Sequence, residues 1–167
     1  VNLEAEESVL GAMLLSQEAI VKARGLLVKN DFSRENYGEI FTTLVDMNEK
    51  GYRLDCTTIS DFLGKEGLEK LGGYQLLFYL SGAVPTACHL DDHARIVLEY
   101  AMQRKLLVVL GELSEETKTP QGGCWPKILD KAQAAISEAR RRTTVTDYLS
   151  VGEVIENLIR KIEAQID

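Results

Sequence analysis

Apolar residues recur at three- and four-residue spacing along the first hundred residues, a period typical of amphipathic helices. Asn2 is placed to cap a first helix, and Glu4 in its opening turn suits the positive end of the helix dipole. Residues 37–45 repeat the pattern, and Gly51 is placed to end that helix. No alternating run is long enough to predict a strand, so residues 1–100 predict a compact bundle of short helices.

Two further helices of this bundle follow from capping residues and composition. Asp55 can cap a short helix that Gly64 or Gly67 closes. Residues 74–80 are then apolar nearly all round a helix, so we expect that helix in the middle of the core.

The second part of the chain predicts a helical hairpin. The pattern from residue 86 to about 118 fits one helix of roughly 30 residues, and a turn then leads to another helix over about 125–142. Residues 101–142 therefore predict a protruding antiparallel hairpin. Two helices cannot bury all of its apolar residues, and an exposed apolar patch usually marks an interface. A second hairpin from an identical chain would complete a four-helix arrangement, so we predict self-association.

The last part predicts a linker over 143–149 and a detached amphipathic helix over 150–167. Ser150 and Glu153 form a capping box at its start. Such a helix needs a surface to lie on, either on its own domain or on another chain. The predicted docking face consists of Val154, Ile155, Leu158, Ile159 and Ile162.

Charge and cysteine usage narrow the class of protein. A net charge of −7 over 167 residues argues against a broad nucleic-acid-binding surface, because binding to phosphates depends on clustered Lys and Arg side chains. The alternative hypothesis, a DNA-binding accessory helical domain, depends on Arg104, Lys105 and the run 140–142. The three cysteines are widely spaced, which indicates reduced thiols in a cytosolic protein. No apolar stretch approaches the roughly 20 residues that span a membrane.

The chain offers little material for catalysis. Gly64-Lys65 lacks the upstream glycine and the following Ser or Thr of a nucleotide-binding loop. His89 and His93 lie one helical turn apart, but further zinc ligands are missing nearby. We therefore expect no catalytic, cofactor or metal site in this chain, and predict that it is not an enzyme by itself.

A family resemblance covers most of residues 2–142. The opening block reads NLEAEESVLGAMLL and closely resembles the start of bacterial DnaB-like replicative DNA helicases, which typically read NIEAEQSVLGAILL. Further matching blocks follow in the family's order and approximate spacing. They are Asp31-Phe32, Ile40-Phe41, Gly51 with Asp55, Leu71-Gly72-Gly73, Ala83-Val84-Pro85-Thr86 and His93-Ala94-Arg95-Ile96-Val97.

The resemblance implies an assembly role. In that family the N-terminal domain is a helical bundle followed by a hairpin, hairpins pair, and the domains form a trimer-of-dimers collar on a hexameric ring. It implies that residues 150–167 pack on a neighbouring subunit's motor domain, and that the motor, with its ATP and Mg²⁺, lies beyond Asp167. Changes in collar packing would reach the motor through this linker helix. The expected location is the bacterial cytoplasm, at nucleoid-associated replication forks.

The resemblance also suggests where partners bind. The family's contacts with the C-terminal domain of primase map to the hairpin region, although the turn at 122–126 departs from the family's usual acidic, polar turn. We therefore expect hairpin residues to serve both self-pairing and primase docking. These residues are Leu107, Leu110, Leu113, Ile128 and Ile136.

Overall fold

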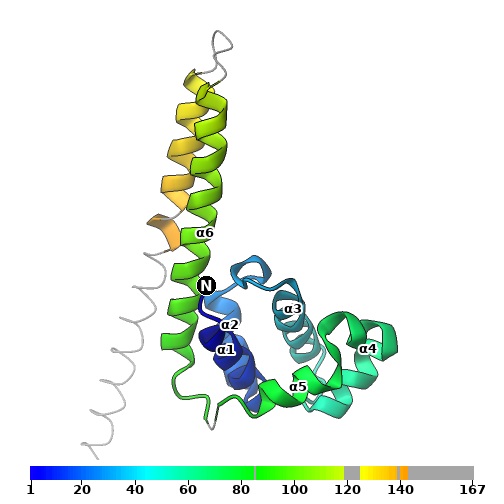
Figure 1. Ribbon diagram of the computed structural model, residues 1–167. Helices are drawn as coiled ribbons and strands as arrows, with labels where there is room; N and C mark the ends of the chain where they lie inside the picture. The colour runs from blue at the N-terminus through cyan, green and yellow to red at the C-terminus, as the bar shows by residue number, and fades with distance from the viewer. Residues whose placement is uncertain (85, 119–124, 139, 143–167) are drawn as a thin grey trace, which may run out of the picture. The chain divides into compact units, whose positions relative to one another are not determined.

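The computed structural model describes residues 1–84, 86–118, 125–138 and 140–142, and divides the chain into two compact units, Val1–Arg104 and Lys105–Asp167. All regular elements within the described residues are helical, which confirms the all-α prediction (Figure 1). They are α1 (Leu3–Leu15), α2 (Gln17–Leu26), the short 3-10 helix η1 (Lys29–Asp31), α3 (Glu35–Glu49), α4 (Cys56–Leu71), α5 (Gly73–Ser81) and α6 (Leu90–Lys118), followed by a helical segment over 125–138.

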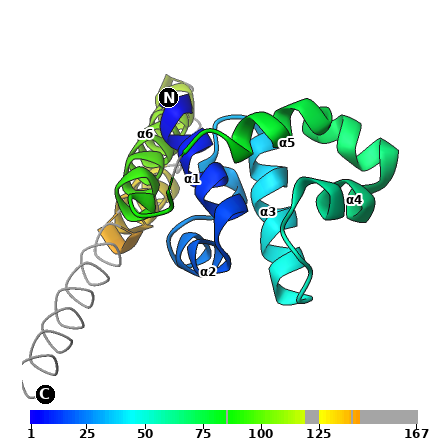
Figure 2. The same cartoon turned by 90° about the horizontal axis from the view of Figure 1, so that it is seen from below.

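Helix α1 is the centre of the first unit. The Asn2 side chain caps it, as predicted, by accepting a hydrogen bond from the Ala5 amide at 3.1 Å. Every residue from Ala5 to Leu14 except Glu7 is buried. This extensive burial follows from its neighbours, because α1 packs against α2, α3 and α5 (Figures 1 and 2).

Helix α5 is not in the middle of the core, so that prediction is wrong. Leu77 and Leu80 are fully buried, but Tyr74, Phe78 and Tyr79 are exposed. Apolar residues occupy both faces of this short helix, and neighbouring helices cover only one of them. Figure 2 shows α5 running from the end of α4 back toward α1, and it contacts both helices.

A glycine sets how closely α1 and α5 approach. A Cβ atom added at Gly11 would lie 2.7 Å from the carbonyl oxygen of Leu80 and 3.2 Å from the Val84 side chain. Any larger residue at this position therefore needs the backbone of α5 to shift.

Two neighbouring carboxylates of α1 hold α3 and α5 by hydrogen bonds. The buried Glu6 carboxylate accepts from the Ser33 amide at 3.0 and 3.1 Å and from the Ser33 hydroxyl at 3.0 Å. Glu7 accepts from the hydroxyls of Tyr37 on α3 (2.6 Å) and Tyr79 on α5 (2.9 Å). Burial, with the hydrogen bond to Glu7, raises the pKa of Tyr37 to about 12.

Helix α4 is interrupted once. Asp55 caps its start, as predicted, by accepting from the Thr58 amide at 2.9 Å. Gly64 then takes a left-handed conformation (φ 64°) and breaks the helix at one of the two predicted stops. The chain resumes the helix as far as Leu71, a continuation that the sequence analysis did not predict.

The described residues of the second unit form two antiparallel helices. Helix α6 is 29 residues long, close to the predicted 30, and its part from Lys105 onward belongs to this unit. Segment 125–138 runs back alongside it (Figure 1). The predicted turn at 119–123, the linker 143–149 and the amphipathic helix 150–167 lie outside the described residues. The predicted division into bundle, hairpin, linker and final helix remains a prediction.

Candidate interaction surfaces

The two helices of the hairpin bury little of each other. Their facing positions include the half-buried Val109 and Leu113 of α6 and the half-buried Ala135 of the returning segment. Among the described residues of this unit, Ile128 is the only hydrophobic side chain that is fully buried. A pair of helices in contact along one seam leaves its remaining apolar side chains exposed to water.

These exposed side chains gather on one side of the hairpin. On α6, exposed Leu110 directly follows half-buried Val109, and on the returning segment exposed Leu129 directly follows buried Ile128. One step along a helix turns by about 100°. Because the helices run antiparallel, this step leads to the same side of the hairpin in both. The hairpin apolar face consists of Leu106, Leu107, Leu110, Trp125, Leu129 and Ile136, which are 41% to 69% exposed.

The rest of the hairpin surface is dominated by charge. Lys131 pairs with Glu116 across the two helices, and Lys105 lies 4.0 Å from Glu138. Glu138 also accepts a hydrogen bond from Arg141 at 2.8 Å, and this bond lowers the pKa of its carboxyl. Among the described residues of the unit, the hairpin apolar face therefore holds every exposed large apolar side chain except Val108.

The predicted hairpin residues fall into two groups. Leu107, Leu110 and Ile136 lie on the hairpin apolar face, whereas Leu113 is half-buried and Ile128 is buried between the helices. Leu106, Trp125 and Leu129 also lie on this face, although they are not among the predicted docking residues. The spacing of residues 125, 129 and 136 was a usable signal, since steps of four and seven residues stay on one helix face. The docking role of these residues remains a prediction. The final-helix residues Val154, Ile155, Leu158, Ile159 and Ile162 lie outside the described residues.

The basic residues of the DNA-binding alternative are engaged within the protein. The Arg104 guanidinium donates to the backbone carbonyl of Asp31. Lys105 and Arg141 both face Glu138. This arrangement reduces the positive charge that these side chains could offer to phosphates.

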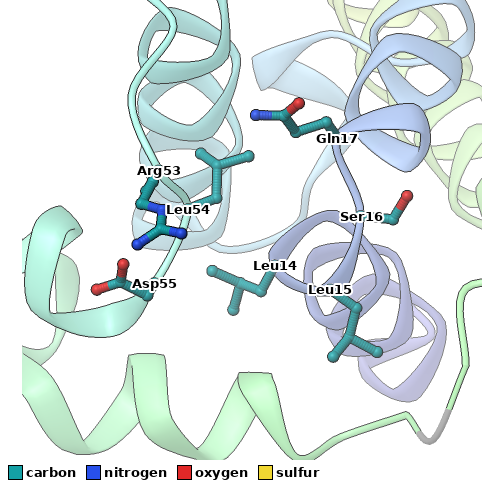
Figure 3. A pocket seen from close by; sticks show the side chains of 7 residues that line it. All are labelled: Leu14, Leu15, Ser16, Gln17, Arg53, Leu54 and Asp55. Atoms are coloured by element: carbon teal, nitrogen blue, oxygen red, sulfur yellow. The ribbon is translucent and has the colours of Figure 1, made fainter.

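Two of the open hollows in the first unit are lined by described residues alone. One, of about 370 Å³, lies between the α1–α2 turn and the segment before α4 (Figure 3). Leu14 and Leu54 line its floor, and the polar side chains of Gln17, Arg53 and Asp55 stand around it. The other, of about 750 Å³, lies between α3 and α4 and carries both acidic and basic side chains.

The part of the chain that the structure describes contains no group of three or more His, Cys, Asp or Glu side chains placed to hold a metal ion. Among those same residues, no helix combines the length and hydrophobicity needed to cross a membrane.

The described residues define an all-α domain, a helical bundle followed by a hairpin that exposes apolar side chains. Comparison with known proteins identifies the family to which this domain belongs. The family model of the DnaB-like helicase N terminal domain matches residues 1–99, so this chain belongs to that family. It corresponds to the non-catalytic N-terminal part of replicative DNA helicases.

Individual relatives agree with this assignment. The chain is 32% identical over 167 residues to the replicative DNA helicase DnaB of Treponema pallidum, and 29% identical over 163 residues to that of Geobacillus stearothermophilus. The alignments cover 98% and 97% of this chain but 37% and 36% of the relatives. The chain therefore spans just over a third of the length of the curated relatives it matches.

Solved structures extend the likeness to the fold. The crystal structure of the N-terminal domain of DnaB helicase from Mycobacterium tuberculosis matches with a TM-score of 0.74 and 32% identity, covering 82% of this chain and 96% of that one. A structure of a DnaB-like replicative helicase and its interactions with primase matches with a TM-score of 0.66 and 27% identity. That match covers 93% of this chain and 35% of the other.

Proposed function

We propose that this chain assembles a hexameric, ATP-dependent replicative DNA helicase and offers a docking site for the C-terminal domain of primase. The family membership supports this role, as does the interaction with primase described for one related structure. The observation that carries it is the hairpin apolar face, where six large side chains are exposed side by side. A face of this kind is typical of a surface that is covered in the assembled protein.

The first occupant of this face is a second copy of the hairpin. Full burial of a large apolar side chain contributes about 1.5–3 kcal/mol of binding free energy. Because these side chains are already about half buried, covering them would contribute about half of that amount. Twelve such side chains in a symmetric pair therefore contribute roughly 12 kcal/mol. Lost translational and rotational freedom costs about 4–15 kcal/mol, so the burial offered by this face is of the size that pairing requires. Three such pairs would form the hexameric collar.

The remaining partners follow from the same family role. Residues 150–167 are proposed to pack on the motor domain of a neighbouring subunit through Val154, Ile155, Leu158, Ile159 and Ile162. ATP and Mg²⁺ belong to that motor domain. The proposed location is the bacterial cytoplasm, at replication forks.

A matched pair of substitutions on α6 tests self-association. Leu110 lies on the hairpin apolar face, whereas Val108, also exposed, lies about 200° around the same helix. Leu110→Glu places a charge in the proposed dimer, and Val108→Glu places the same charge outside it. Light scattering after gel filtration, over a wide range of concentration, should give a monomer for the first variant and the wild-type mass for the second.

Because both positions are exposed, both variants should keep the wild-type helical signal in circular dichroism. A Leu110→Glu variant with unchanged mass would contradict the proposal, and so would equal dissociation of both variants. Primase docking is tested separately, by calorimetric titration of the wild-type chain with the C-terminal domain of a bacterial primase.

A further inference from the structure

Helix α5 exposes aromatic side chains where a surface helix normally carries polar ones. Tyr74, Phe78 and Tyr79 are 46%, 68% and 57% exposed, and we call these three side chains the α5 aromatic face. Phe78 is the most exposed aromatic side chain among the described residues. Tyr74 and Phe78 are four residues apart and so lie one above the other on the helix.

One of these rings is held in place. The Tyr79 hydroxyl donates a hydrogen bond to the Glu7 carboxylate at 2.9 Å. The aromatic ring stays exposed to solvent although its hydroxyl is hydrogen-bonded. This hydrogen bond raises the pKa of the Tyr79 hydroxyl, because the charged phenolate would lose the bond and face the Glu7 carboxylate. A ring fixed in this way loses little further freedom when a partner covers it.

The side of the face next to α1 is acidic. Helix α1, which packs against α5, carries Glu4, Glu6 and Glu7 and no lysine or arginine, whereas α4 on the other side carries both acidic and basic residues. Glu6 is buried and bonded to Ser33, but Glu4 is exposed and its charge acts on Tyr79. Aromatic faces and carboxylates both attract cationic side chains.

The size of the face limits its occupant. Aromatic side chains bury about 150–250 Å² each, so the exposed parts of these three amount to roughly 350 Å². Each partner in a stable complex buries about 800 Å². A single helix or extended segment fits this area better than the broad surface of a second folded domain.

We propose that the α5 aromatic face is a docking site for a short segment of a partner protein in which an apolar side chain is flanked by lysine or arginine. The segment lays its apolar side chain on Phe78 and directs its cations toward Tyr79 and Glu4. This site lies in the first unit and does not depend on self-association through the hairpin.

The test uses two fluorescein-labelled helical peptides with the same leucine pattern, one with lysine and one with glutamate at the polar positions. Fluorescence anisotropy measures their binding to the whole 167-residue chain. Nuclear magnetic resonance on the same ¹⁵N-labelled chain locates the contact. We expect the lysine peptide to bind and to shift the amide signals of α5, and we expect the glutamate peptide not to bind.

Matched variants separate the site from general attraction to an acidic protein. Phe78→Gln should weaken binding of the lysine peptide at least about tenfold, the loss typical of a central aromatic contact. Val21→Gln alters an equally exposed apolar residue on α2 and should leave the affinity unchanged. Glu4→Gln should weaken binding severalfold and flatten its dependence on salt.

Three results would overturn the proposal. The first is no binding of the lysine peptide, or equal binding of both peptides. The second is an equal effect of the Phe78 and Val21 substitutions. The third is a wild-type oligomer that Phe78→Gln dissociates, because the occupant would then be a second copy of this chain.

Discussion

Replacing two glycines of the first unit by alanine should change its stability in opposite directions. At Gly11 the new Cβ would lie 2.7 Å from the Leu80 carbonyl oxygen, a contact that only a shift of α5 can relieve. Overpacking of this kind lowers the free energy of unfolding by about 1–3 kcal/mol, whereas the better helix propensity of alanine raises it by about 1 kcal/mol. At Gly25, in α2, a Cβ meets nothing within 4 Å, so only the gain of about 0.5–1 kcal/mol remains.

Thermal unfolding followed by circular dichroism measures the midpoint temperature of each variant, and the two shifts from the wild type should have opposite signs. One kcal/mol corresponds to about 4–8 °C in the midpoint of a domain of this size. Gly11→Ala should therefore lower the midpoint by several degrees, and Gly25→Ala should raise it by a few. A Gly11→Ala variant that is stabilised as much as Gly25→Ala would refute the close packing of α1 against α5, because the new Cβ atom would then cost nothing.

Two further predictions concern the carboxylates of α1. Glu6→Ala leaves Ser33 without the acceptor of its amide and hydroxyl, and should cost about 3 kcal/mol in urea unfolding; a loss below 1 kcal/mol would show that water replaces the carboxylate. The pKa of Tyr37 rises from 10.0 to about 12 on folding, so its stabilising contribution is complete below pH 10 and is lost as the pH rises through 12. The free energy of unfolding should therefore fall by about 2 kcal/mol between pH 9 and pH 12. Tyr37→Phe should remove this loss and Tyr74→Phe, at an exposed ring, should keep it.

Much of the fold was predictable because local signals and tertiary packing agree. Asn2 and Asp55 cap helices as their side chains predict, and Gly51 follows the end of α3 with a positive φ. The length of α6 followed from a long run free of proline. In each case the deciding interaction lies within a few residues of the signal.

The position of α5 was not predictable for the opposite reason. A nine-residue helix with apolar residues on every side does not say which side its neighbours cover. That choice is made by α1, which lies far away in the sequence, together with the preceding helix α4, and these two helices cover only the side of Leu77 and Leu80.

The hairpin was predictable in kind but not in detail. Exposed apolar residues followed from counting what two helices can bury, as Leu107 and Leu110 illustrate. Which residues face inward depends on how the two helices align, and this alignment places Ile128 inside and Leu129 outside. Residues next to each other in sequence therefore have opposite roles.

The carboxylate of Glu7 serves two donors at once, with Oε1 accepting from Tyr37 and Oε2 from Tyr79. The NIEAEQSVLGAILL block that is typical of the family has glutamine at this position. A glutamine could accept from Tyr37 through its oxygen, but its nitrogen could meet Tyr79 only by donating to that hydroxyl oxygen. The acid at position 7 therefore fixes both tyrosine hydroxyls as donors, whereas an amide would reverse the direction of one of the two hydrogen bonds.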